Sequence, residues 1–178
     1  MPQPKTQFVN PPHPATLDDV ALQKQSTLTF GRDAGPGGQH RNKVETAACW
    51  THDPTGISGT ASERRKQSEN RSKAMRRLRM KLAIYVRTNV SRKYHQPSEL
   101  WKQRRQGKQI SINPKHRDYP ALLAEALDVI IARKFDVAGA AGVLGISMSQ
   151  LAKLVRHDRH AFALVNEGRT QRGLPALK

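Results

Sequence analysis

Positive charge in this chain is concentrated in one third of its length, which limits what that third can contribute to a core. Positions 62 to 117 contain eighteen Lys or Arg against three Asp or Glu, so they carry +15 of the net charge of +17. A solvated surface usually mixes both signs, so this block favours a polyanion as partner. Aromatic residues make up only 5% of the chain. We therefore expect contact with backbone phosphates and recognition of shape rather than base stacking, with binding that weakens as salt rises.

Composition limits the size of the hydrophobic core and indicates the cellular compartment. With 37% hydrophobic residues in 178, the chain can bury one modest core or two small ones. The single cysteine, Cys49, excludes an internal disulfide, and its neighbours Ala48 and Trp50 predict a buried strand thiol. No apolar run approaches the length of a membrane span, and the first residues have no apolar signal core. These features predict a cytoplasmic protein with no membrane partner.

The first half of the chain predicts a small sheet covered by one long helix. Five of the 11 prolines lie in residues 1 to 15, which are expected to form a disordered or extended lead-in. A short helix up to Lys24 should precede a strand over 28–30. A Pro-Thr-Gly turn at 54–56 predicts a hairpin of strands over 44–52 and 57–61. Apolar residues then recur at three and four, which predicts an amphipathic helix from 67 to about 90 with basic outer faces.

The second half reads as helical. A short basic helix with Trp101 and a linker over 107–117 should lead into helices that begin near Tyr119, Val137, Met148 and Asp158. The stretch AAGVLGISMSQLAKLVR resembles helix-turn-helix modules. A purely structural helical hairpin explains it equally well. Since the last third of the chain nets only +2, ribosomal RNA, another protein or the chain's own first domain are partners as plausible as duplex DNA.

The segment Gly35-Pro36-Gly37-Gly38-Gln39-His40 displays one uncharged amide on an otherwise bare tip. Glycine permits close backbone approach, and Pro36 restricts the shape of the segment. A glutamine stays neutral, so it can orient a water but cannot act as a titrating base. Taken alone, the tripeptide would also suit a glycine-rich turn between two elements.

The sequence around this segment resembles the catalytic domain of bacterial-type class I peptide chain release factors and their ribosome-rescue relatives. The resemblance runs from Leu28 to Leu82 through motifs that occur in order. They are Gly-Gly-Gln followed by His40, Asn42 and Lys43, a Thr-His strand end at 51–52, the Pro-Thr-Gly turn, and Gln67-Ser68 with Asn70, Arg71 and Lys73. Two departures add positive charge: Arg41 replaces a small apolar residue, and Ser62-Glu63-Arg64-Arg65-Lys66 replaces an acidic, Gln-rich approach to the helix.

The resemblance and the residue patterns together predict an α+β fold. The resemblance implies a small domain in which a short β-sheet is packed by a long amphipathic helix, and it implies a basic linker after this domain. The residue patterns add a small all-α, helix-turn-helix-like C-terminal region, whose apolar helices depart from the basic tail of the rescue relatives. We expect an N-terminal extension over 1–26, the catalytic domain over 27–92, a basic helix and linker over 93–118, a helical region over 119–167 and a tail over 168–178.

The resemblance also supplies a reaction, the hydrolysis of the peptidyl-tRNA ester at the peptidyl transferase centre of the large ribosomal subunit. The sequence has no hydrolase triad, no metal-ligand spacing and no need of a cofactor. By analogy, the backbone N–H of Gln39 stabilises the oxyanion and its side chain places water, while Gly37 and Gly38 permit the approach. The expected RNA contacts are Arg32, His40, Arg41, Asn42, Lys43, Arg64, Arg65, Lys66, Ser68, Asn70, Arg71, Lys73, Arg76 and Arg77.

Release factors that decode carry a separate domain for the stop codon, and only about 27 residues precede the first strand of the domain here. The sequence therefore predicts codon-independent release on stalled ribosomes, with the ribosome and peptidyl-tRNA as partners and a further protein or RNA site for the C-terminal helices. The alternative is a non-enzymatic RNA- or DNA-binding regulatory protein that reuses the domain.

Overall fold

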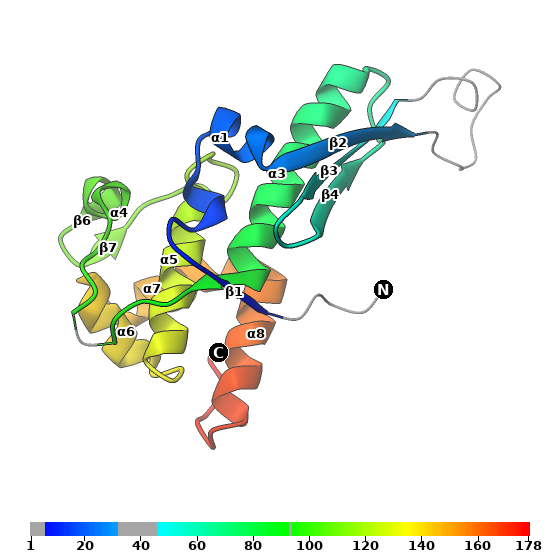
Figure 1. The fold of residues 1–178 in the computed structure, drawn as a ribbon. Coiled ribbons are helices and arrows are strands. Elements are labelled where there is room, and N and C mark those ends of the chain that lie inside the picture. Colours follow the sequence, from blue (N-terminus) through cyan, green and yellow to red (C-terminus); the bar gives the residue numbers. More distant parts are fainter. Residues whose placement is uncertain (1–5, 32–45, 93) are drawn as a thin grey trace.

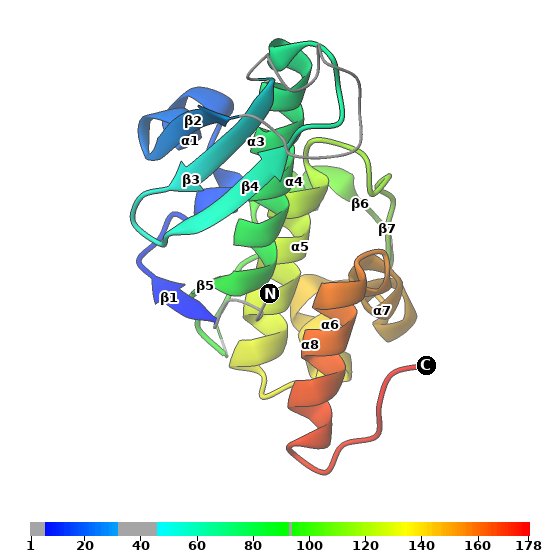
Figure 2. The same ribbon diagram turned by 90° about the vertical axis from the view of Figure 1, so that its right-hand side faces the viewer.

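The computed structural model describes residues 6–31, 46–92 and 94–178, and it has the mixed α+β architecture predicted from the sequence (Figure 1). An antiparallel sheet has the strand order β2 (Ser26–Gly31), β3 (Ala47–His52), β4 (Ile57–Ala61). The long helix α3 (Gln67–Tyr85) packs against β3 and β4. Figures 1 and 2 show the sheet on one side of α3 and α5 (Tyr119–Ala132) on another.

The hairpin of β3 and β4 forms as its turn residues predict. Gly56 has a φ of +67°, and its backbone N–H donates to the carbonyl of His52 over 2.8 Å. Ala48, Trp50 and His52 are buried, whereas Cys49 is only half-buried. The prediction of a buried thiol was therefore wrong, because alternate side chains of a strand point to opposite faces and Trp50 takes the face toward α3.

Helix α3 is held to the sheet by a row of fully buried residues at helical spacing, namely Ala74, Leu78 and Leu82. The helix ends at Tyr85, five residues earlier than the sequence pattern predicted. The β-branched residues at 86 and 88 belong to a short strand, β5 (Val86–Thr88). Val86 is apolar and buried and follows the helical spacing of α3, so in the sequence it looked like a continuation of the helix.

The proline-rich lead-in is ordered from residue 6 onward, where the sequence predicted a disordered or extended segment. Strand β1 (Gln7–Val9) pairs in parallel with β5, and a 3-10 turn, η1 (Pro14–Thr16), packs against α3 and α5. Helix α1 (Asp19–Lys24) follows, capped by the side chain of Asp18. The buried ring of His13 accepts a hydrogen bond from the backbone N–H of Ala15 and lies 2.9 Å from the carbonyl oxygen of Val86. These pairings are long-range, so local composition could not reveal them.

The C-terminal helices pack on the same hydrophobic core as the sheet and α3. Helix α5 lies against α3, η1 and β5, and most of its residues are buried. Around α5 pack α6 (Val137–Leu144), α7 (Met148–Arg156) and α8 (Arg159–Thr170). The predicted short basic helix is α4 (Glu99–Arg104). After it comes a hairpin of β6 (Arg105–Gln106) and β7 (Gln109–Ile110), where the sequence predicted a linker from residue 107 onward. The buried Trp101 donates through Nε1 to the carbonyl of Leu144 over 2.9 Å.

The junction of α6 and α7 has the features of a helix-turn-helix. The two helices are bent by 102°, Gly145 caps α6 with a φ of +69°, and Ser147 caps α7 by accepting from the N–H of Gln150 over 3.3 Å. The N–H of Ser147 donates to the carbonyl of Lys108, which lies outside α7. Within the described ranges, no single helix is long and apolar enough to cross a membrane, although α6 and α7 together meet that length and composition.

Candidate nucleic-acid interface

The predicted catalytic residues Gly37, Gly38 and Gln39 lie outside the described residues, as do the predicted RNA contacts Arg32, His40, Arg41, Asn42 and Lys43. The structure does define both ends of the segment that contains them. Gly31 at the end of β2 and Ala47 at the start of β3 are partners in the antiparallel ladder. The two strand ends that flank residues 32–45 therefore lie side by side at the same end of the sheet (Figure 1). We refer to residues 32–45 as the catalytic segment, after the residues predicted there.

Asn70 ties this edge of the sheet to α3. Its amide nitrogen donates to the carbonyl of Thr46 over 2.7 Å and to the carbonyl of Arg64 over 2.8 Å. Its amide oxygen accepts from the N–H of Arg64 over 2.9 Å. The side chain is fully buried. Asn70 was predicted to contact RNA, but the structure gives it another position, as a clamp between the end of the catalytic segment and the approach to α3.

Seven of the nine described residues predicted to contact RNA have exposed side chains: Arg64, Arg65, Lys66, Ser68, Arg71, Arg76 and Arg77. Lys73 is half-buried. They lie on α3 and on the residues that lead into it, so this helix and its approach carry a basic surface. Charges spaced in this way along a helix suit the repeating phosphates of a nucleic acid backbone.

One carboxylate organises part of this surface. Glu63 accepts from Arg77 and lies 3.4 Å from Nζ of Lys73. A hydrogen bond to its own backbone amide and the nearby Arg77 guanidinium lower the pKa of the Glu63 carboxyl to about 2. Arg77 also donates to the carbonyl of Thr60 over 2.7 Å. Glu63 therefore stays ionised at neutral pH and holds Arg77 and Lys73 above the end of β4.

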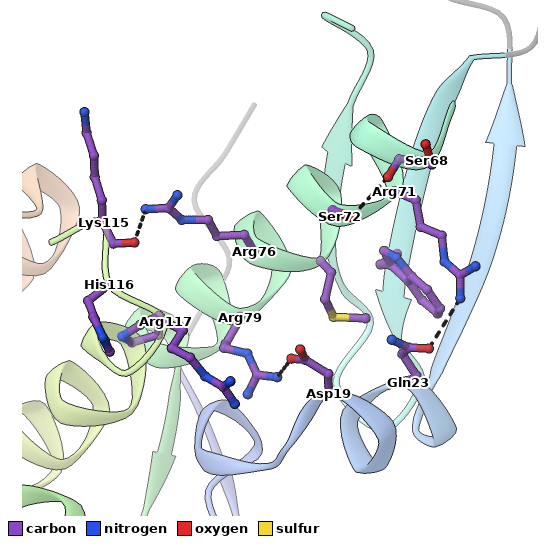
Figure 3. A pocket seen from close by; sticks show the side chains of 13 residues that line it. Asp19, Gln23, Ser68, Arg71, Ser72, Arg76, Arg79, Lys115, His116 and Arg117 are labelled. Atoms are coloured by element: carbon purple, nitrogen blue, oxygen red, sulfur yellow. Dashed lines mark hydrogen bonds and ion pairs between the residues drawn. The ribbon is translucent and has the colours of Figure 1, made fainter. Parts of the chain in front are cut away.

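A second group of basic side chains lines a cleft of about 560 Å³ beside α3. Its walls come from α1, from α3 and from residues 113–118, which we call the 113–118 turn (Figure 3). Its cations are Arg71, Arg76, Arg79, Lys115 and Arg117. Arg76 bridges two walls, since its Nη2 donates to the carbonyl of Lys115 over 3.0 Å. The guanidinium of Arg71 covers the Trp50 ring, 5.5 Å from the ring centre.

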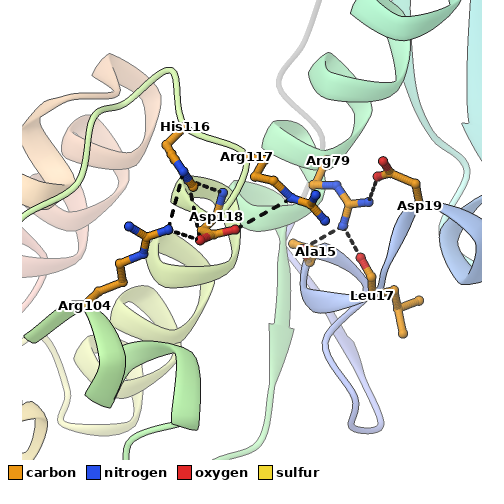
Figure 4. Close-up of polar contacts among 8 residues, drawn as sticks. All are labelled: Ala15, Leu17, Asp19, Arg79, Arg104, His116, Arg117 and Asp118. Atoms are coloured by element: carbon orange, nitrogen blue, oxygen red, sulfur yellow. Dashed lines mark hydrogen bonds and ion pairs between the residues drawn. The ribbon is translucent and has the colours of Figure 1, made fainter.

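Arg79 secures the floor of this cleft rather than its opening. It donates to the carbonyls of Ala15 and Leu17 and lies 2.6 Å from Oδ1 of Asp19 (Figure 4). Its side chain is only 11% exposed. Arg79 therefore attaches the N-terminal segment to α3.

The sequence prediction missed Arg79, Lys115, His116 and Arg117 as lining residues of the cleft. Lys115 and Arg117 are separated from Arg76 by about forty residues and were assigned to a linker. A signal was present, because all of them fall inside the basic block of residues 62 to 117. Charge alone could not show that the 113–118 turn returns to α3.

Among the described residues, no group of three or more His, Cys, Asp or Glu side chains could hold a metal ion. The half-buried Cys49 lies 3.9 Å from the hydroxyl of Thr51, and the part of the chain that the structure describes gives the thiol no disulfide partner. Cations outnumber carboxylates among the described residues of the site, which suits binding of a polyanion.

Comparison with known families identifies the domain that carries this site. The model of the RF-1 domain matches residues 19–121, which include the sheet, the catalytic segment, α3 and the 113–118 turn. The chain belongs to the RF-1 domain family. The fold expected from the release factor resemblance is the one observed, with a short sheet packed by a long helix.

Individual relatives are release factors. Peptide chain release factor 1 of Chlorobaculum tepidum is 50% identical over 66 residues, which are 36% of this chain and 18% of that protein. Peptide chain release factor 1 of Lacticaseibacillus casei is 43% identical over 82 residues, 44% of this chain and 23% of the relative. Peptide chain release factor 2 of Campylobacter fetus is 40% identical over 72 residues, 39% and 20% respectively. The chain thus spans about a fifth of the length of the curated relatives it matches.

The RF-1 domain match ends near the start of α5, so α6, α7 and α8 lie beyond it. On α7, Ser149, Lys153 and Arg156 have exposed side chains. Gln150 and Lys153 line a small hollow together with residues of the 110–114 segment. The N–H of Ser147 donates a hydrogen bond to the carbonyl of Lys108. The chain's own hairpin therefore lies beside the face with which a recognition helix would enter a DNA groove.

Proposed function

We propose that this chain hydrolyses the ester bond of peptidyl-tRNA on the ribosome and so releases the nascent peptide. The observation that carries the proposal is the Gly-Gly-Gln sequence within an RF-1 domain, in a segment whose two ends, Gly31 and Ala47, are paired strand residues next to the basic surface of α3. Membership of the family and the names of the relatives, all peptide chain release factors, support this reaction.

The proposed chemistry uses the backbone as well as the side chain of Gln39. Attack of water on the ester carbonyl develops negative charge on its oxygen, and a correctly placed N–H lowers that barrier. The backbone N–H of Gln39 donates to this oxygen, and the neutral side-chain amide orients the water. Gly37 and Gly38 have no Cβ, so the segment can approach the ester closely. The remaining groups at the reaction centre are those of the ribosome and the tRNA.

The proposed partners are the large-subunit ribosomal RNA at the peptidyl transferase centre and the peptidyl-tRNA. The exposed cations of α3 and its approach supply phosphate contacts that orient the catalytic segment, among them Arg64, Arg65 and Lys66. The predicted RNA contacts at Arg32, His40, Arg41, Asn42 and Lys43 remain part of this proposal. The setting of the reaction is the cytoplasm, where ribosomes act.

We further propose that release by this chain does not depend on a stop codon. The charge of residues 62 to 117 supports delivery through RNA affinity. Stalled ribosomes are the substrate that this proposal names, so the reaction would be one of ribosome rescue.

Peptide release should be measured with purified ribosomes that carry peptidyl-tRNA, once with a stop codon in the decoding site and once with an mRNA that ends before it. We expect release in both. Gly38→Ala should abolish release, because a Cβ would obstruct the approach. Gln39→Ala should keep much of the activity, because the backbone N–H remains. Full release by Gly38→Ala would overturn the assignment, and release only with a stop codon would overturn codon independence.

The same ribosome preparation also tests the alternative function, a non-enzymatic DNA- or RNA-binding role. Binding to ribosomes without mRNA should be tighter than binding to duplex DNA of matched length at equal salt. Tighter binding to DNA, together with no release, would favour a regulatory protein that uses α7.

A further inference from the structure

The cleft beside α3 has a fixed wall that carries two outward cations. In the 113–118 turn, the N–H of Lys115 donates to the side-chain oxygen of Asn113 over 2.8 Å, and the N–H of His116 donates to its carbonyl over 2.8 Å. The carbonyl of Lys115 accepts from Arg76. The backbone of the turn is thus hydrogen-bonded both to Asn113 within the turn and to Arg76 on α3. These bonds fix the positions from which the side chains of Lys115 and Arg117 extend.

Asp118 holds the other end of this turn. Its carboxylate lies 2.5 Å from Nη2 of Arg104, 3.5 Å from Nδ1 of His116 and 3.9 Å from Nε of Arg117 (Figure 4). The side chain of Arg117 is nevertheless 81% exposed. A partner can thus reach this guanidinium without breaking the turn.

Charge in the cleft is strongly unbalanced. Five Lys or Arg side chains line it with one carboxylate, that of Asp19, and Asp19 is already paired with Arg79. Arg71, Arg76, Lys115 and Arg117 remain with exposed side chains around the opening. An occupant with several negative charges at regular spacing would relieve the mutual repulsion of these cations.

The aromatic ring of the cleft is not free to stack a base. Trp50 is 5% exposed, and the Arg71 guanidinium lies over it. Stacking on nucleobases requires an open ring face. The cleft is therefore built for the backbone of a nucleic acid and reads its shape rather than its sequence.

We propose that this cleft is a second RNA-binding site, which holds the phosphodiester backbone of ribosomal RNA between α3 and the 113–118 turn. Lys115 and Arg117 contact phosphates from one wall, and Arg76 and Arg71 contact them from the other. The proposal rests on the proposed ribosomal function for the source of the RNA. Because the turn is anchored on α3 through Arg76, RNA held here fixes the orientation of the helix whose Asn70 is hydrogen-bonded to Thr46, just before β3.

The test is RNA binding by the full chain, measured apart from peptide release. Deproteinised large-subunit ribosomal RNA and intact ribosomes are titrated at several salt concentrations. The variant is Lys115→Gln with Arg117→Gln. Its matched control is Lys153→Gln with Arg156→Gln, which removes the same two charge types from exposed positions on α7. Thermal unfolding of each variant shows whether the fold is kept. The single variants Lys115→Gln and Arg117→Gln should each give about half of the change in salt dependence that the double variant gives.

For the cleft variant we expect the slope of log affinity against log salt to fall by about 1.4 to 1.8, at about 0.7 to 0.9 for each lost phosphate contact. This corresponds to binding weaker by roughly 10- to 30-fold at 0.15 M salt. The α7 control should bind within about twofold of the unaltered chain. Equal losses in both double variants would overturn the proposal, because net charge alone would then explain binding.

A loss on ribosomes without a loss on deproteinised RNA would also overturn it, since the partner would then be a ribosomal protein. If the unaltered chain releases no peptide but the cleft variant shows the expected loss of RNA binding, the proposed hydrolysis fails and the RNA site stands.

Discussion

Nη1 of Arg87 lies 2.8 Å from Oδ1 of Asp128, and both side chains are buried in the contact between β5 and α5. Arg87 also donates to the carbonyls of Ala83 and Ala124, and the N–H and hydroxyl of Thr88 donate to Oδ2 of Asp128. Burial lowers the pKa of Arg87 to about 10, against the effect of Asp128, so the guanidinium stays charged at neutral pH. This ion pair joins the strand that follows α3 to the first helix of the C-terminal region.

Removal of one partner should be costly. In Asp128→Ala, Arg87 keeps its charge without a buried counter-charge, which typically costs about 3 to 5 kcal/mol. The free energy of unfolding from urea denaturation measures this loss. Glu167→Gln is a control, because this carboxylate is exposed and accepts a hydrogen bond over 3.4 Å from the side-chain amide of Gln171, four residues later. A loss below about 1 kcal/mol in Asp128→Ala would show that the pair does not hold the two regions together.

The Asn70 clamp predicts a variant in which activity falls together with local order. Asn70→Ala removes three hydrogen bonds and leaves the carbonyls of Thr46 and Arg64 without this partner. We expect a loss of about 2 to 3 kcal/mol in unfolding free energy. Peptide release should fall further than this stability change explains, because the end of the catalytic segment loses its attachment to α3. Denaturation and single-turnover release measure the two effects.

Thr170→Ala is the matched control for the clamp, since this exposed residue of α8 donates through its hydroxyl to the carbonyl of Asn166 in its own helix. It should change stability by less than about 0.5 kcal/mol and leave release unchanged. Unaltered release by a folded Asn70→Ala protein would show that the clamp does not position the catalytic segment.

Local patterns in the sequence predicted most of the secondary structure. The turn at Gly56, the glycine cap at Gly145 and the serine cap at Ser147 each act through neighbouring backbone, so their signals are contained in a few residues. The sheet and α3 were found in the same way. Resemblance to release factors added the catalytic residues, which periodicity could not have selected.

The sequence did not reveal contacts between segments that are far apart along the chain. The pairing of β1 with β5 and the bond between Arg76 and the carbonyl of Lys115 depend on how the chain folds back. Arg87 lies in a basic block that predicted solvent exposure, yet it is fully buried because Asp128, forty-one residues later, compensates its charge. Burial of a charge is decided by its partner, and no local pattern identifies that partner.

His13 predicts a loss of stability in weak acid. Burial, reinforced by the charge of Arg87, lowers the pKa of this imidazole from 6.5 to about 4. The folded protein therefore holds His13 neutral, while the unfolded chain binds a proton below pH 6.5. Its contribution to stability is complete above pH 6.5 and is lost as the pH falls toward 4, by up to about 3 kcal/mol at about 1.4 kcal/mol per pKa unit.

Urea denaturation at a series of pH values between 7 and 4 measures this effect. His13→Gln should flatten the dependence of unfolding free energy on pH relative to the unaltered chain. Burial also lowers the pKa of His52, so a smaller dependence of the same sign should persist in His13→Gln. An unchanged slope in His13→Gln would show that this ring is not the group that titrates.

Gly59 sets how closely β4 approaches α3. A Cβ at this position would lie 2.2 Å from the backbone nitrogen of Leu78 and 2.5 Å from the carbonyl oxygen of Ala74. Both are main-chain atoms of a helix, so they cannot move aside as a flexible side chain would. Gly59→Ala should therefore force α3 away from the sheet and cost about 3 kcal/mol or more in unfolding free energy. Gly142→Ala, in α6 with open space around its Cβ, should instead keep or raise stability by up to about 1 kcal/mol, since alanine favours a helix. If the two substitutions had equal effects, the close packing of β4 on α3 would not be what joins the sheet to the basic helix.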